Sequence, residues 1–290
     1  MTPASFDLTI RNGRISNADR TFHADIGVRD GVIVAIAPDL PPGTRDVDAS
    51  GRWVLPGGID SHCHIEQLSG MGVMCADDFY SGTVSAAFGG TTTILSFAAQ
   101  HRNDSIPEVV QAYARLAREK AVIDYGFHLI LTNPDETALR AHLPQVIRDG
   151  ITSLKVYMTY DKLKLDDYQL LEVMAVAGEQ GALIMMHAEN HDMIRWIAHR
   201  LLERGHVAPK FHAVAHDRLA ESEATHRAIA LARLADVPVL IVHVAGRETV
   251  EVIRHARQLG AAVYAESCPQ YLFLEADDAD LPGVEGAKFC

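Results

Sequence analysis

Two patterns of apolar and polar positions divide the chain near Trp53. Up to residue 52, short stretches alternate between apolar and polar residues, as in Phe6-Asp7-Leu8-Thr9-Ile10, and turn signals such as Asn12-Gly13 and Asp30-Gly31 separate them. This alternation predicts short strands joined by tight turns. We therefore expect residues 1–52 to form the N-terminal part of a small β-sandwich.

From Trp53 onward, apolar runs alternate with segments of helical periodicity. The apolar runs cover residues 53–60, 91–98, 122–131, 151–159, 182–187, 237–245 and 261–266. The helical segments between them include Pro107–Lys120, Tyr168–Gln180, Glu221–Ala235 and Glu248–Leu259. Strands that are apolar on both faces and separated by helices are typical of a parallel sheet. About seven such units predict an α/β fold over residues 53–290, a (β/α)8 TIM-type barrel. An open doubly wound sheet is the alternative, but no GxGxxG motif follows the first strand, which argues against a dinucleotide-binding fold of that kind.

The strand count also bears on completeness. Seven strands are one fewer than a closed barrel of this type contains. The chain stops at Gly286-Ala287-Lys288-Phe289-Cys290, where a further element could begin. We therefore expect that the sequence is truncated before strand eight and is the N-terminal part of a longer protein.

Composition limits the possible partners. The 290 residues are 48% hydrophobic and carry a formal net charge of −12, which argues against nucleic acid or an anionic membrane as a partner. No apolar run approaches the roughly 20 residues that a membrane-spanning helix needs. The four cysteines have no CxxC spacing, which is typical of free thiols in a reducing compartment. We expect a cytoplasmic protein.

Four histidines and one lysine interrupt the apolar runs near their carboxyl ends. His62 and His64 close the first run, and strand alternation places them on one face. Lys155 lies in the fourth run, His187 ends the fifth, and His243 lies in the sixth. The carboxyl ends of barrel strands carry the active site, and imidazoles suit zinc or a similar divalent ion. Taken singly, His62 and His64 are also typical of ordinary surface or core histidines, and His187 and His243 of hydrogen-bonded core residues. Lys155 alone could extend its stem to the strand end. Together the five predict a metal centre.

Lys155 requires an explanation of its own, because an ammonium group cannot bind a cation. Burial lowers the pKa of a lysine, and the neutral amine can add CO2 to form a carbamate. The carbamate has two oxygens and could bridge two metal ions. Two ions roughly 3.5–4 Å apart can share a hydroxide and polarise a carbonyl, which promotes hydrolysis.

Seven further stretches form a recognisable set. They are Pro56-Gly57-Gly58-Ile59-Asp60-Ser61-His62-Cys63-His64, Asp77-Asp78-Phe79 with Ser81-Gly82-Thr83, Gly89-Gly90-Thr91-Thr92, Lys155-Val156-Tyr157-Met158-Thr159-Tyr160, His187-Ala188-Glu189-Asn190, Glu266-Ser267-Cys268-Pro269-Gln270-Tyr271-Leu272 and Glu285-Gly286-Ala287-Lys288. Through these motifs the chain resembles the dihydropyrimidinases and hydantoinases, which are cyclic amidases of the amidohydrolase superfamily. The resemblance covers essentially the whole chain.

The resemblance implies a binuclear zinc site. His62 and His64 would hold one zinc ion, His187 and His243 the other, and carboxylated Lys155 would bridge them. A hydroxide between the metals would attack the ring amide of a dihydropyrimidine or a 5-substituted hydantoin and give an N-carbamoyl amino acid. Tyr160 would hydrogen-bond to the developing oxyanion from a loop just past its strand. A homo-oligomer, either a tetramer or a dimer, is implied as well.

The chain departs from the family pattern at its C-terminal end. The family has a further ligand and general base, an aspartate after strand eight, at a position beyond Cys290. Asp277, Asp278 and Asp280 lie in an acidic stretch before that point, and we expect them to be solvated. The 290-residue polypeptide alone is therefore expected to hydrolyse dihydrouracil or hydantoin poorly.

Three alternatives remain open from the sequence. Dihydroorotases resemble the chain, but they typically place an arginine where this chain has Glu66. Allantoinases have a similar metal site; the Leu, Met and Val content of the loop 67–74 suits an apolar ring substituent better than the ureido arm of allantoin. A non-catalytic scaffold of the same fold, like the collapsin-response proteins, would lack the ligand residues that this chain keeps.

Overall fold

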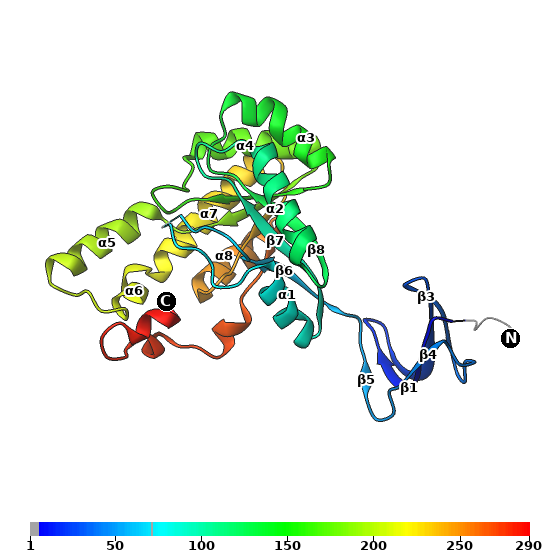
Figure 1. The fold of residues 1–290 in the computed structure, drawn as a ribbon. Coiled ribbons are helices and arrows are strands. Elements are labelled where there is room, and N and C mark those ends of the chain that lie inside the picture. The colour runs from blue at the N-terminus through cyan, green and yellow to red at the C-terminus, as the bar shows by residue number, and fades with distance from the viewer. Residues whose placement is uncertain (1–5, 71) are drawn as a thin grey trace. The chain divides into compact units, whose positions relative to one another are not determined.

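The computed structural model describes residues 6–70 and 72–290, which form two compact units (Figure 1). The first unit ends at Ile59 and also includes Gly90–Thr92. The second unit consists of Asp60–Gly89 and Thr93–Cys290, and it contains every residue of the candidate site.

The first unit is a five-stranded sheet. Its strands are β1 (Leu8–Ser16), β2 (Thr21–Arg29), β3 (Val32–Ala37), β4 (Arg45–Asp48) and β5 (Trp53–Val54). The order is β3-β2-β1-β4, and β5 also pairs with β1. Asp30-Gly31 forms the predicted hairpin between β2 and β3, and both residues have positive φ. Within the described residues this unit is a single sheet, so the second layer of a sandwich stays a prediction.

Asn12-Gly13 does not form a turn, and that prediction is wrong. The pair lies inside β1, where the register against β2 shifts between Ile10 and Gly13. Asn12 has φ of 58°, and its amide donates to Asp25 Oδ1 at 2.8 Å. An Asn-Gly pair supplies the left-handed backbone that a β-bulge needs, so the same local signal serves a bulge here.

The second unit is built on a sheet of seven strands in sequential order, from β6 to β12 (Figure 1). The strands are β6 (Gly58–Cys63), β7 (Thr91–Ala99), β8 (Asp124–Ile130), β9 (Ser153–Tyr157), β10 (Leu183–His187), β11 (Val239–Ile241) and β12 (Val263–Ala265). The strands from β7 to β12 pair in parallel. This arrangement confirms the predicted α/β class and matches seven successive units of a (β/α)8 barrel. The sheet is open, with β6 and β12 at its edges.

Two predicted strands differ from the observed ones. The run at 53–60 is divided, because Trp53–Val54 pairs with β1 in the N-terminal sheet and β6 begins only at Gly58. The run at 237–245 was too long, since β11 ends at Ile241. His243 therefore lies two residues beyond its strand rather than within it.

Helices connect successive strands of the second unit. They are α1 (Phe79–Phe88), α2 (Ile106–Lys120), a π-helical turn (Ala138–His142) continuing into α3 (Leu143–Arg148), α4 (Asp167–Gln180), α5 (His191–Glu203), α6 (Phe211–Ala215), α7 (Arg218–Leu234) and α8 (Arg247–Gln258). The four predicted helices correspond to α2, α4, α7 and α8. Their ends follow local signals: Asp166 caps α4 in a capping box, and Gly181 ends it in the left-handed conformation.

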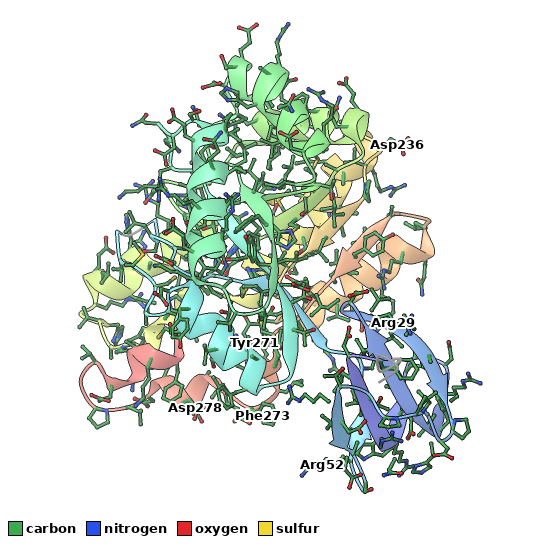
Figure 2. All side chains as sticks on the ribbon, turned by 45° about the vertical axis from the view of Figure 1, so that its right-hand side comes forward. Arg29, Arg52, Asp236, Tyr271, Phe273 and Asp278 are labelled. Atoms are coloured by element: carbon green, nitrogen blue, oxygen red, sulfur yellow. The ribbon has the colours of Figure 1, made fainter. Side chains whose placement is uncertain are left out.

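The chain beyond β12 has three short 3-10 turns, Pro269–Leu272, Ala276–Ala279 and Glu285–Phe289. Tyr271 belongs to the first of them and Phe273 caps it (Figure 2). All four cysteines are free, as the sequence predicted. In the part of the chain that the structure describes, no helix is long and apolar enough to cross a membrane.

The central strands β9 and β10 are buried on both faces, and strand alternation decides which side chains face which side. On β9, Leu154 and Val156 belong to the large core that also contains the helix residues Leu170 and Val173. Tyr157 belongs to the smaller core on the other face, and Lys155 has the same parity as Tyr157. Lys155 therefore lies on the face of the smaller core, with 1% of its surface exposed.

Candidate metal centre

The five predicted ligand residues converge at the carboxyl ends of four strands. His62 is in β6 and His64 follows its last residue; Lys155 lies within β9 and His187 ends β10. His64, Lys155, His187 and His243 line a cavity of about 920 Å³. His62 lies next to them, with its Nε2 3.5 Å from Lys155 Nζ.

The imidazole rings lie close enough together to share bound ions. The ring centroids of His187 and His243 are 4.5 Å apart, and His243 Nε2 lies 3.0 Å from His187 Nδ1. The His62 ring is 5.5 Å from that of His64 and 5.8 Å from that of His243. The structure therefore brings all five residues, separated by up to 181 positions in the sequence, into one cluster.

Three of the histidines have a side-chain oxygen within hydrogen-bond distance of one ring nitrogen. Glu266 Oε1 contacts His62 Nδ1, and Gln67 Oε1 lies 2.7 Å from His64 Nδ1. Glu189 Oε2 lies 2.8 Å from His187 Nε2. An acceptor on one ring nitrogen fixes the ring and its tautomer and leaves the opposite nitrogen free, which is how metal-binding histidines are usually held.

These acceptor side chains were not among the predicted site residues. Glu189 and Glu266 stand within motifs that the resemblance relied on, but no function was predicted for them. The signal that could have found them is positional: Glu189 follows β10 by two residues, and Glu266 follows β12 directly. A carboxylate at the end of a strand next to a ligand-bearing strand is a candidate for holding a histidine ring.

Burial favours the neutral form of three histidines in the cluster, His64, His187 and His243. It lowers the pKa of His64 to about 4 and, with the neighbouring His187 and Lys155, that of His243 to about 2. It also lowers the pKa of His187, although Glu189 opposes this. A neutral imidazole has a free lone pair, so these rings are in the protonation state that binds a metal.

Lys155 has the environment that its predicted modification requires. Burial lowers the pKa of its amine to about 7, and the charges of Glu266 and Cys268 oppose this shift. The Nζ atom lies 5.1 Å from the ring centroid of Phe97 and 5.3 Å from that of Tyr157. Near neutral pH a substantial fraction of the side chain is therefore the neutral amine, which is the nucleophilic form.

The donor set fits a divalent metal, although the rings are not arranged as a preformed cage. Within residues 6–70 and 72–290, no three His, Cys, Asp or Glu side chains already adopt a metal-binding geometry. His187 and His243 instead hydrogen-bond to each other through the nitrogens that would face an ion. Several neutral imidazoles beside a potential carbamate make a nitrogen and oxygen set that suits zinc or a similar ion.

Tyr160 lies in a tight turn directly after β9. Its φ is 69°, and its carbonyl accepts from the amides of Leu163 at 3.0 Å and Lys164 at 2.9 Å. Its ring lies edge-on to that of His187, with the centroids 5.1 Å apart. Burial, together with the charge of Glu189, raises the pKa of Tyr160 to about 12, so the hydroxyl keeps its proton.

Positive φ values recur beside the cluster. Glu66, Tyr160 and His243, none of them glycine, have φ of 50°, 69° and 40°. Such conformations cost about 1–3 kcal/mol each and tend to persist where the surrounding structure requires a side chain in a particular place. All three residues lie within three positions of a strand's carboxyl end, which is where the site is built.

The loop 67–74 contributes differently from what its apolar residues suggested. Its cavity-lining residues are Gln67, Ser69 and Gly70, while Leu68 and Met74 pair with each other across the loop. Val73 is 63% exposed, and Met71 lies outside the described residues. The inference of an apolar ring substituent from this loop is therefore wrong in its premise, because the described apolar members do not line the cavity.

Other histidines near the cluster have structural partners. His128 is buried beneath β6, with its Nε2 2.9 Å from the Ser61 carbonyl and its Nδ1 2.5 Å from Ser153 Oγ. His216 lines the cavity, and its Nδ1 lies 2.8 Å from Glu189 Oε1. Hydrogen bonds from His187 and His216 outweigh the effect of burial and lower the pKa of Glu189. Glu189 therefore binds both rings as a carboxylate.

Comparison with known proteins identifies the relatives of the chain. A model of the amidohydrolase family matches residues 53–270. The D-hydantoinase of Ralstonia pickettii is 41% identical over 285 residues, and that of Geobacillus stearothermophilus is 42% identical over 283 residues. These alignments cover 98% and 97% of this chain but only 62% and 60% of the relatives, so the chain spans about three fifths of their length.

Solved structures give the same result. A D-hydantoinase structure matches with a TM-score of 0.95 at 41% identity, and the match covers 98% of this chain and 62% of the D-hydantoinase chain. The dihydropyrimidinase of Brevibacillus agri matches with a TM-score of 0.93 at 41% identity, with 97% and 61% covered. The fold, the convergence of the five residues and these similarities agree: the chain belongs to the amidohydrolase family, and it is similar to the D-hydantoinases and a dihydropyrimidinase within it.

Proposed function

We propose that the protein hydrolyses a cyclic amide, either a 5-substituted hydantoin or a dihydropyrimidine, to an N-carbamoyl amino acid. The observation that carries the proposal is the convergence of four histidines and one buried lysine at a single cavity. A fold alone does not define a reaction, because one fold hosts many. The similarity to D-hydantoinases over 98% of the chain supplies the substrate class.

In this proposal His62 and His64 would hold one zinc or similar divalent ion, His187 and His243 would hold a second, and the carboxylated Lys155 would be a ligand for both. Such a pair of ions polarises a carbonyl and supplies an activated water. The protein itself would orient the ligand side chains. Glu266, Gln67 and Glu189 hold the rings at the nitrogens that face away from the centre.

Tyr160 has the proposed role of hydrogen-bond donor to the reacting carbonyl oxygen. Its hydroxyl is protonated at neutral pH, and the turn after β9 fixes its ring beside His187. A donor positioned before the reaction stabilises the charge that develops on this oxygen at no cost in reorganisation. The proposal also includes assembly into a homo-oligomer, either a dimer or a tetramer, in the cytoplasm.

A hydrolysis panel tests the proposed function. Full-length, zinc-loaded protein is assayed with dihydrouracil, 5-substituted hydantoins, allantoin and dihydroorotate. We expect turnover of hydantoins or dihydrouracil. Turnover of allantoin alone would assign the allantoinase reaction instead, and no turnover together with no bound metal would indicate a non-catalytic scaffold.

A further inference from the structure

We infer that the preferred ring substituent ends in an anionic group, such as a carboxylate, which Arg195 binds. This inference rests on the proposed hydrolysis of 5-substituted hydantoins and defines their substituent. It follows from the wall of the cavity that α5 forms.

One face of α5 forms this wall. The cavity-lining residues of the helix are His191, Ile194, Arg195, Ala198 and His199, which follow the spacing of a single helical face. His191, Arg195 and His199 are separated by four residues each, so successive side chains lie about 6 Å apart along the helix. The helix begins four residues after the ligand His187, and Arg195 therefore stands one turn outward from the start of the helix.

Two cations at this cavity lack a protein partner. In the part of the chain that the structure describes, the side chains of Arg195 and Lys162 form no hydrogen bond or ion pair, although both line the cavity. The single acid among the described lining residues, Asp161, is paired with His191 at 3.3 Å. The protein as a whole has 38 acidic and 26 basic residues, so unpaired cations around one cavity run against its overall charge.

The remaining lining residues indicate the form of the substituent. Leu163, Ile194 and Ala198 are apolar and share the cavity with Arg195 and Lys162. The volume of about 920 Å³ lies near the upper end of the range for small-molecule sites and leaves room beyond one ring. A short apolar stem that ends in a carboxylate, as in 5-(2-carboxyethyl)hydantoin, satisfies both the apolar and the cationic residues.

The reaction is unchanged by this substituent. Water adds to the ring amide, the carbonyl carbon gains an oxygen and loses its bond to nitrogen, the released nitrogen takes one proton, and the new carboxyl group loses the other to solvent. The product is an N-carbamoyl derivative of an acidic amino acid. It carries one more negative charge than the substrate, at the carboxylate formed from the ring.

The test compares 5-(2-carboxyethyl)hydantoin with the neutral 5-isopropylhydantoin in the full-length, metal-loaded enzyme. We expect Arg195→Gln to lower kcat/KM for the carboxylate substrate about tenfold more than for the neutral one, mainly through KM, as is usual for loss of a charge-assisted hydrogen bond. Raising the ionic strength should weaken the preference of the wild type. Arg200→Gln is the matched control, since Arg200 is on the same helix, pairs with Glu203 and does not line the cavity.

Melting temperatures and metal content of both variants establish that they are folded and loaded. If hydantoins are hydrolysed but Arg195→Gln changes both substrates equally, or if the wild type disfavours the carboxylate substrate, this inference is wrong while the proposed function stands. If no hydantoin is hydrolysed, the proposed function fails and this inference fails with it.

Discussion

Glu266, directly after β12, is hydrogen-bonded to the imidazole of His62 in β6, 204 positions earlier in the chain. These two strands are the opposite edges of the seven-stranded sheet. In a flat sheet, six spacings of about 4.8 Å would hold its edges about 29 Å apart. Direct contact between residues at the two edges therefore requires a sheet that curls like a barrel. The curl places the predicted ligand His62 of β6 against the carboxyl end of β12.

Removing the Glu266 carboxylate should weaken metal binding. The variant Glu266→Ala leaves His62 Nδ1 without its acceptor, so the ring loses its fixed orientation. Loss of such a supporting group typically costs about 10–100-fold in metal affinity. Competition with a chelator measures this affinity, and Glu285→Ala is the control because Glu285 lies on the surface paired with Lys288. An unchanged affinity in Glu266→Ala would show that His62 needs no support from this group.

Tyr160→Phe should reduce kcat and leave metal content unchanged. The substitution removes only the hydroxyl, and loss of one oxyanion donor typically lowers kcat by about 10²–10³-fold. The KM should change little because the donor acts mainly on the charge that develops during the reaction. Steady-state kinetics measure the effect, with Tyr168→Phe as control at the exposed start of α4. Equal activity of wild type and Tyr160→Phe would exclude the proposed role.

His128 should make the stability of the fold depend on pH. Burial lowers its pKa below the ordinary value of 6.5. Below pH 6.5 the unfolded chain therefore binds a proton that the folded chain does not, and stability falls as the pH decreases from there towards the folded pKa.

The variant His128→Gln tests this dependence because glutamine has no such titration. Glutamine can still donate to the Ser61 carbonyl, the partner of His128 Nε2. Between pH 7.5 and 5.5 we expect the melting temperature of the wild type to fall more steeply than that of the variant. Parallel curves would mean that His128 does not contribute to the acid sensitivity.

The sequence was sufficient for the periodic parts of the fold. The apolar runs of β7 to β10 and the amphipathic segments of α2, α4, α7 and α8 appear where their patterns predicted them, because burial on a sheet or on one helix face imposes those patterns. Helix α5 was missed. None of its residues is buried, so packing against a core did not impose an amphipathic pattern on its sequence. Its exposed Trp196 and Met193 also place apolar residues on the solvent side of the helix.

The predicted metal-binding residues could be found from the sequence, but the side chains that hydrogen-bond to them could not. Histidines and a lysine in apolar strands are conspicuous because burying them is costly. The position of Glu266 after an apolar run marks it as a candidate, but its partner His62 follows only from the curl of the sheet, and the role of Gln67 depends on how its loop returns. The same holds for Arg195, whose position on the cavity follows from where α5 begins.

The most direct test of the central claim is the metal content of the full-length wild type and of Lys155→Met. Methionine fits the buried position of Lys155, which is 1% exposed, but it cannot form a carbamate. We predict about two divalent ions per chain in the wild type and one or none in the variant, with loss of hydantoin hydrolysis. A wild type without metal, or a Lys155→Met variant that retains both ions, would contradict the account.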